Sequence, residues 1–120
     1  MSPQSDSPQH VAVVILNWNG RAHLETYLPS VLEHTLGEAE VWVADNGSTD
    51  DSLMWLESNH PEVRTVALER NWGFAEGYNK ALAIVDADVY VLLNSDVRIV
   101  SRWIGPVLEV MDERGWSVAS

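Results

Sequence analysis

The stretch VAVVIL (residues 11–16) decides the fold. It is an unbroken run of apolar, mostly β-branched residues with no polar residue alternating in it. Such a run is typical of a strand that is buried on both faces of a parallel sheet. It is also far short of the roughly 18 residues that a membrane span requires. We therefore expect a protein whose sheet is covered by helices on both sides.

The chain on either side of this run alternates between strand and helix patterns. Further strands are predicted at residues 40–44, 63–68, 89–93 and 116–119, and helices at residues 22–36, 50–59, 74–85 and from 101 or 105 to about 114. This order predicts an α/β fold, a three-layer α/β/α arrangement with a mostly parallel, doubly wound, Rossmann-like sheet. Pro29 predicts a kink in the first helix or its division into two, and Ser48 or Thr49 is predicted to cap the second.

We expect two segments of different character. Residues 1–10 are polar and rich in Pro and Ser, without the charged and apolar regions of a signal peptide, and are predicted to be disordered. Residues 11–120 are predicted to form one domain. The last predicted strand begins just before Ser120, so we expect the sheet to be incomplete within these residues.

The composition excludes several classes of function. The formal net charge of −11 argues against sequence-independent nucleic-acid binding, which needs a basic face. The absence of cysteine excludes disulfides, thiolate zinc sites and cysteine nucleophiles. Hydrophobic residues make up 46% of the chain, enough for a folded core. We expect a cytoplasmic protein, with peripheral association at the inner face of the membrane as the alternative location.

Polar clusters follow three of the predicted strands: NWNG (residues 17–20), DNGSTD (residues 45–50) and NSD (residues 94–96). In open parallel sheets, ligands bind beyond the carboxyl ends of the strands, where the strand order reverses. If the spatial order is 3-2-1-4, the first and fourth strands flank that point. Asn17, Asp45 and Asp96 would then share one crevice.

Two interpretations remain open for each of the two acidic clusters. Asp96 could bind a divalent cation when a diphosphate supplies the other oxygens, with Asn94 at the ribose or the metal, or NSD could simply be a turn. Asp45 could accept the ring N–H of a uracil or thymine base. It could also close an Asx-turn in which Gly47 supplies a positive φ, and both interpretations can hold together.

The stretch RNWGFAEGYNKAL (residues 70–82) is the most unusual in the chain. Gly73 and Gly77 allow close approach to a ligand or a neighbouring strand, at the start of a helix whose free N–H groups attract anions. Asn71 and Asn79 could hold the loop or contact a nucleotide. Neither a G-x-G-x-x-G fingerprint nor a phosphate loop of the G-x-x-x-x-G-K-[ST] type is present.

Taken together, these stretches resemble the N-terminal half of family 2 glycosyltransferases, which are inverting, nucleotide-sugar-dependent enzymes of GT-A fold. VVILNWNG is similar to their first strand and base-binding loop, and VWVADNGSTDDS to their second strand and its D-N-x-S-x-D loop. RNWGFAEGYNKAL resembles a segment common in the rhamnosyltransferase-like branch, and VLLNSDV occupies the place of the metal-binding D-x-D.

The resemblance implies a role for each matching residue. The residues that would contact the nucleotide are Asn17, Trp18, Asn19, Asp45, Asn71, Gly73, Asn79 and Asn94. Asp96 would bind Mg²⁺ or Mn²⁺ bridging the diphosphate. The sequence departs from the family pattern at Asn94, where D-x-D has its first acid, and this departure weakens the negative charge of the metal site.

The activity implied is transfer of a sugar from a UDP- or dTDP-sugar to a hydroxyl of an acceptor glycan or lipid-linked sugar. The family's general base would lie beyond Ser120, so residues 1–120 would carry donor binding without a catalytic base. A non-catalytic nucleotide-sugar-binding module of the same fold is the alternative. A receiver-like phosphoacceptor domain is disfavoured, because Asn17 and Asn19 stand where it needs acids and Lys80 is within a predicted helix. Exposed sheet surface could also support a homodimer.

Overall fold

The computed structural model describes residues 10–35 and 37–114. Within them the elements alternate between strand and helix as predicted, and their bounds are β1 (Val11–Asn17), α2 (Arg21–Thr35), β2 (Glu40–Asp45), α3 (Ser52–Asn59), β3 (Arg64–Ala67), α4 (Phe74–Ile84), β4 (Val89–Leu93) and α5 (Ile104–Arg114). The predicted disordered segment, apart from His10, and the predicted strand at residues 116–119 lie outside the described residues.

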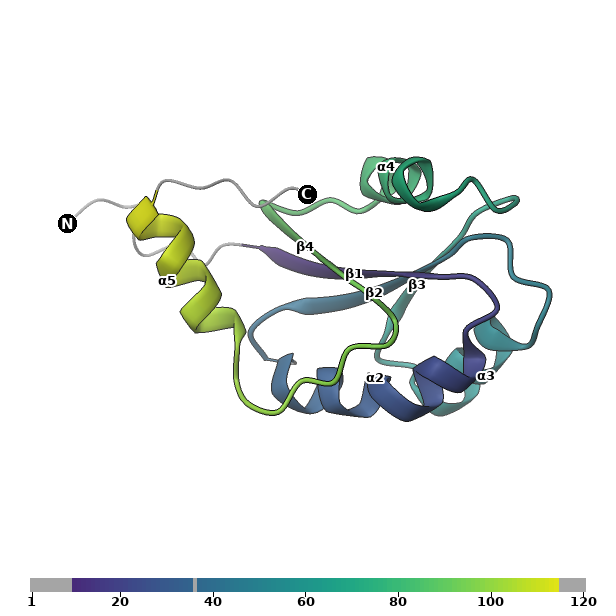
Figure 1. The fold of residues 1–120 in the computed structure, drawn as a ribbon, viewed down its shortest axis with the longest axis horizontal. Coiled ribbons are helices and arrows are strands. Elements are labelled where there is room, and N and C mark those ends of the chain that lie inside the picture. The colour runs from purple at the N-terminus through teal and green to yellow at the C-terminus, as the bar shows by residue number, and fades with distance from the viewer. Residues whose placement is uncertain (1–9, 36, 115–120) are drawn as a thin grey trace.

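The four described strands form one parallel sheet in the order β3-β2-β1-β4. This is the order assumed from the sequence, and it makes the sheet doubly wound. Figure 1 shows α4 on one side of the sheet and α2 with α3 on the other. α5 lies beside the amino ends of β1 and β4, where Ile104 packs against Val11 and Val89. The predicted three-layer α/β/α fold is confirmed.

The composition of β1 explains why it occupies the centre. Successive side chains of a strand point to opposite faces. Ala12 and Val14 accordingly pack in the cluster under α4, whereas Ile15 packs with Leu24 and Leu28 of α2. The residues from 11 to 15 are at most 2% exposed. An apolar side chain at every position is therefore what a strand with helices on both faces requires.

Helix α2 is a single element of 15 residues with Pro29 inside it. The predicted division into two short helices is wrong. Proline removes one backbone hydrogen bond from a helix, but Leu28 and Leu32 on either side of it are buried against the sheet. Packing of this face outweighs the lost bond. Among the described residues no helix has the length and hydropathy to cross a bilayer.

The predicted cap of α3 is also wrong. The helix begins at Ser52, and neither Ser48 nor Thr49 caps it. Instead, a carboxylate oxygen of Asp50 accepts hydrogen bonds from the N–H and the hydroxyl of Ser52. The side chain of Ser48 turns back toward the sheet, where it joins the network described below.

Candidate functional site

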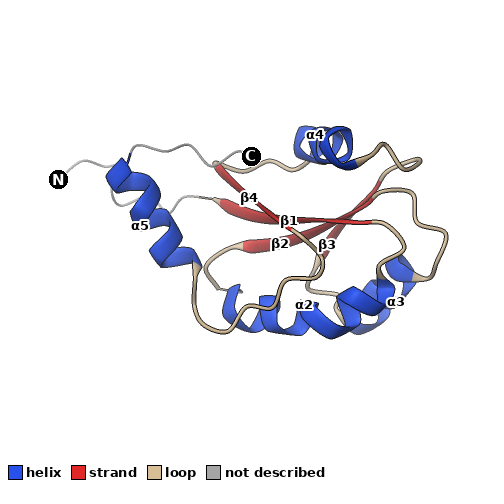
Figure 2. Ribbon diagram, in the orientation of Figure 1, coloured by secondary structure: helices blue, strands red, loops and turns tan. Residues whose placement is uncertain are grey.

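The three polar clusters predicted to converge follow β1, β2 and β4, which Figure 2 shows as strands of one sheet. Asn17 is paired directly with Asp45 in the last rung between β1 and β2. On the other side of β1, pairing with β4 ends at Ile15 and Leu93, and Asn94 follows at once. Because all of these strands are parallel, the three clusters occupy the same edge at the point where the strand order reverses.

A buried hydrogen-bond network joins the ends of β1 and β2. Asn17 is fully buried and donates from Nδ2 to Asp45 Oδ1 at 2.9 Å and to Ser48 Oγ at 3.3 Å. Asp45 is 3% exposed and also accepts from the hydroxyl of Ser48 at 2.7 Å and from its N–H at 3.0 Å. Three of the roughly four acceptor positions of the carboxylate are therefore occupied, and the free one is on Oδ2.

The loop after β1 is bound to the loop after β2 by a second set of contacts. Asn19 has a φ of +49° and accepts the N–H groups of Thr49 at 2.7 Å and Asp50 at 3.1 Å through Oδ1. Its own N–H donates to Ser48 Oγ at 2.8 Å. The side chain predicted to contact a nucleotide therefore fixes the relative position of two loops.

Asn46 binds the loop that precedes α4. It is 2% exposed, donates from Nδ2 to Asn71 Oδ1 and to the carbonyl of Gly73, each at 3.1 Å, and accepts from Trp72 N at 3.0 Å. Asn71 and Gly73 are thus held against the end of β2, at the same edge as Asp45. Gly73 has a φ of +83°, and both residues are exposed.

Gly47 lets this loop approach the end of β2. Its φ is positive, as the sequence predicted, with a value of +75°, and a Cβ at this position would lie 2.5 Å from the backbone of Arg70. Only glycine accommodates both the positive φ and the close approach without strain. Three consecutive residues therefore connect β2 to its surroundings. Asp45 bonds to the end of β1, Asn46 binds the loop before α4, and Gly47 allows that loop to approach closely.

The end of β4 differs from the ends of β1 and β2, because its amide and carboxylate side chains are exposed. Asn94 and Asp96 are exposed, and Ser95 and Asp96 form a turn, so the turn interpretation of NSD holds. Asp96 makes no hydrogen bond or ion pair with another described residue. A Cβ built on Gly20 would lie 2.5 Å from Asn17 Oδ1 and 3.8 Å from the Ser95 hydroxyl, which places this turn beside the end of β1. Asn17 Oδ1 itself is buried without a hydrogen-bond partner.

Two further predicted site residues, like those at the end of β4, stand apart from these networks. Trp18 is 54% exposed in the loop after β1, and Asn79 is exposed on α4. The described residues contain no group of three or more His, Cys, Asp or Glu side chains that could hold a metal. A cation at Asp96 would therefore need most of its oxygen ligands from a bound molecule.

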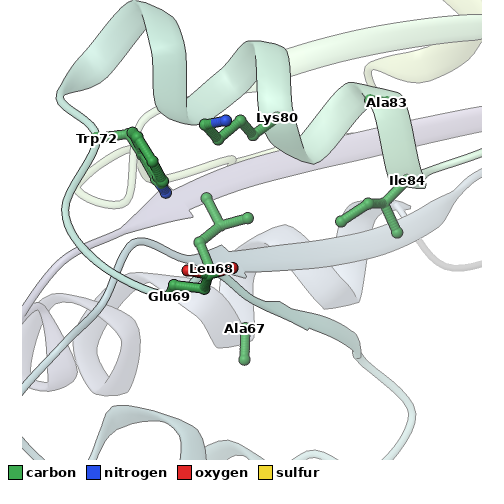
Figure 3. A pocket seen from close by; sticks show the side chains of 7 residues that line it. All are labelled: Ala67, Leu68, Glu69, Trp72, Lys80, Ala83 and Ile84. Atoms are coloured by element: carbon green, nitrogen blue, oxygen red, sulfur yellow. The ribbon is translucent and has the colours of Figure 1, made fainter.

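A pocket of about 320 Å³ lies between the end of β3 and α4 (Figure 3). Its lining residues are Ala67, Leu68, Glu69, Trp72, Lys80, Ala83 and Ile84. The centroid of the Trp72 ring lies 3.9 Å from the guanidinium carbon of Arg70 and 4.0 Å from Lys80 Nζ. Trp72 thus contacts two cations, of which Lys80 also lines this pocket.

Sequence reasoning missed the residues that organise the site. Asn46 was given no role of its own and Ser48 only that of a possible helix cap, although Asn46 binds the loop at residues 71–73 and Ser48 binds Asn17 and Asn19. Their signal was present in the cluster DNGSTD, whose six residues offer more polar groups than one turn requires. The edge as a whole presents exposed amide, hydroxyl and carboxylate groups beside a rigid buried network.

Comparison with known proteins gives consistent findings. Residues 12–119 match the family model described as glycosyl transferase family 2. The chain is 32% identical over 107 residues to the putative teichuronic acid biosynthesis glycosyltransferase TuaG of Bacillus subtilis, covering 87% of this chain and 42% of that protein.

Two solved structures share the fold at 23% identity. One is S. aureus TarS 1–349 in complex with UDP-GlcNAc, with a TM-score of 0.74 over 88% of this chain and 32% of the other. The second is the mannosyltransferase PcManGT from Pyrobaculum calidifontis with GDP-Man and Mn²⁺, with a TM-score of 0.69 over 81% of this chain and 30% of that one. The chain therefore spans less than half the length of each of these proteins. The structural similarity confirms the predicted GT-A fold.

Proposed function

Because the chain belongs to glycosyl transferase family 2, we propose that it forms the donor-binding part of an inverting glycosyltransferase. The enzyme would transfer a sugar from a UDP- or dTDP-sugar to a hydroxyl of an acceptor glycan or lipid-linked sugar. One observation carries this proposal. The ends of β1, β2 and β4 bring Asn17, Asp45 and Asn94 to one edge of the sheet, at the point where the strand order reverses.

The base would bind on the β2 side of this edge. A pyrimidine with an imide N–H needs an acceptor, and Asp45 Oδ2 has one acceptor position that no described residue occupies. Trp18, which is 54% exposed, would pack against the base or the ribose. Asn19, Asn71 and Gly73 would border the nucleotide through the loops that Ser48 and Asn46 hold in place. Asn79 would contact it from α4.

The diphosphate would bind on the β4 side. Asp96 would hold Mg²⁺ or Mn²⁺ together with diphosphate oxygens, with Asn94 beside them. A bound divalent cation there would offset the charge that develops on the leaving diphosphate. With a single carboxylate at this position, we expect weak affinity for the cation until a nucleotide is bound.

The general base is proposed to lie outside residues 1–120. An inverting transfer needs a carboxylate beside the acceptor hydroxyl, on the opposite side of the sugar from the leaving group. Asp45 and Asp50 are committed to hydrogen bonds within the β1 and β2 loops. We therefore assign neither as the general base, since the one free acceptor position of Asp45 is the one proposed for the pyrimidine N–H.

Calorimetric titration with UDP and with dTDP, each with and without Mn²⁺, tests the proposal. We expect weak binding that Mn²⁺ strengthens, and loss of the Mn²⁺ effect in Asp96→Ala. Asp86→Ala is the matched control, because Asp86 is also an exposed carboxylate but lies before β4, at the opposite edge of the sheet. Absence of binding by either nucleotide would contradict donor binding. Retention of the Mn²⁺ effect in Asp96→Ala would contradict the role of Asp96.

A further inference from the structure

The hydroxyl of Tyr78 lies where β1 and β4 separate. Tyr78 belongs to α4, is 4% exposed, and packs with Val14 in the core. Its hydroxyl donates to the carbonyl of Leu93 at 3.0 Å and accepts from the N–H of Leu16 at 3.4 Å. These are backbone groups of the last residues before Asn94 and Asn17. One side chain therefore contacts the ends of both strands that flank the proposed crevice.

The surrounding structure fixes this hydroxyl. α4 lies close to the end of β1, because a Cβ on Gly77 would come within 3.1 Å of Leu16 Cδ2. The Phe74 ring packs edge-on against the Tyr78 ring, with 5.0 Å between centroids. Burial raises the pKa of the Tyr78 phenol, so the hydroxyl keeps the proton that it donates to Leu93.

The position of Tyr78 matters because the two sides of the edge are supported unequally. The β2 side is held by the bonds of Asn17, Asp45 and Ser48. The turn at Ser95 and Asp96 is separated from the last β1–β4 rung only by Asn94, and Asp96 makes no bond to a described residue. The Tyr78 hydroxyl is thus the side-chain contact immediately before this turn.

We propose that Tyr78 is a positioning residue for the donor site, which holds the ends of β1 and β4 so that the base side and the diphosphate side keep a fixed separation. This inference rests on the proposed function. Loss of the hydroxyl would free the end of β4, and ordering that end on binding would then cost affinity. The loss would weaken the Mn²⁺-dependent part of binding most, because that part depends on Asp96.

Tyr78→Phe has a matched control in Tyr90→Phe. Tyr90 packs against the same core cluster, and its hydroxyl also donates to a backbone carbonyl, that of Val85 at 2.6 Å, and accepts from a backbone N–H, that of Ala87 at 3.3 Å. These contacts are at the amino end of β4, away from the proposed site. Both substitutions keep the ring and remove one hydroxyl with two backbone partners.

Calorimetry measures the ratio of UDP affinity with Mn²⁺ to UDP affinity without it. We expect Tyr78→Phe to lower the affinity in Mn²⁺ about tenfold and to reduce this ratio, while Tyr90→Phe changes both by less than about twofold. A purely structural role would lower the urea midpoint in both variants and leave the ratio unchanged. An unchanged ratio in a folded Tyr78→Phe protein would overturn the proposal.

Amide hydrogen exchange separates failure of this inference from failure of the proposed function. In Tyr78→Phe we expect faster exchange at Leu16 and at residues 94–96, and in Tyr90→Phe no change there. This readout needs no ligand, so it still decides whether Tyr78 holds the ends of β1 and β4 if the unmodified protein binds no nucleotide. If Tyr78→Phe does not fold, exchange in the unmodified protein decides. A Leu16 amide that is protected supports the contact with Tyr78, and one that exchanges freely overturns it.

Discussion

The ends of β2 and β4 lie at the same edge of one sheet, yet they are built in opposite ways. Asp45 at the end of β2 is buried, and Asn17 and Ser48 supply its hydrogen bonds. Asp96 after β4 is exposed and makes no bond to another described residue. The first carboxylate serves the fold whether or not a ligand is present. The second makes no side-chain bond that would hold the described fold together.

The difference predicts that the β2 carboxylate carries stability and the β4 carboxylate does not. Asp45→Ala leaves the buried amide of Asn17 and two donors of Ser48 without their acceptor. Because unsatisfied buried donors retain the full cost of desolvation, we expect a loss of about 3 kcal/mol in the free energy of unfolding. Urea denaturation measures it. A loss under about 1 kcal/mol would mean that the network at the end of β2 is not energetically important.

Asn46 extends the comparison to the loop before α4. Asn46→Ala removes two donated bonds and one accepted bond that hold Asn71, Trp72 and Gly73. We expect a loss of about 2 kcal/mol in the free energy of unfolding, together with faster amide exchange at residues 71–73. Asn59→Ala is the control, because Asn59 is an exposed asparagine that makes one bond to the carbonyl of Trp55. Equal losses in the two variants would contradict a special role for Asn46.

The strands and the polar residues at their ends could be predicted from the sequence, because each strand has a distinctive composition, whereas the spatial order 3-2-1-4 was an assumption that the structure confirms. Runs of β-branched residues marked the strands, and the polar clusters at their ends indicated which ends meet. The pairing of Asn17 with Asp45 then follows from the parallel order. A prediction of this kind needs only local patterns and the rule that ligands bind at the carboxyl edge.

The contacts within the site could not be predicted in the same way. Tyr78 is 62 residues from Leu16 and 15 from Leu93, and no local pattern indicates that its hydroxyl bonds to both. Ser48 was predicted to cap a helix, which is the usual role of serine at such a position, but tertiary contacts with Asn17 and Asn19 take its hydroxyl. Local preference fails where two segments distant in sequence compete for one polar group.

Asp50 offers a test of the β2 loop by pH. Burial alone would raise the pKa of Asp50, but hydrogen bonds from the hydroxyl and N–H of Ser52 and from the N–H of Arg21 together lower it below its ordinary value of 3.8. A carboxyl group whose pKa is lowered by folding stabilises the folded state at pH values above its ordinary pKa. This stabilisation is lost as the pH falls below that pKa.

We therefore expect the unmodified protein to exceed Asp50→Asn in free energy of unfolding at pH 7, and the difference to shrink below pH 3.8. Urea denaturation of both proteins at several pH values measures it. The other carboxyl groups are common to both proteins and cancel in the comparison. A difference that stays constant with pH would show that the charge of Asp50 contributes nothing to the loop.

Asp96→Ala should have the smallest effect on folding. The side chain is exposed and makes no bond to a described residue, so its removal should change the free energy of unfolding by less than about 0.5 kcal/mol. Val100→Ala replaces another exposed side chain after β4, and its free energy of unfolding, measured by urea denaturation, is the control for a substitution with little effect on stability. Binding of UDP in Mn²⁺ should separate the two variants, because only Asp96→Ala removes a carboxylate from the proposed diphosphate side. If Asp96→Ala instead lowered stability as much as Asp45→Ala, the end of β4 would be a structural element like the end of β2, and the contrast between the two ends would disappear.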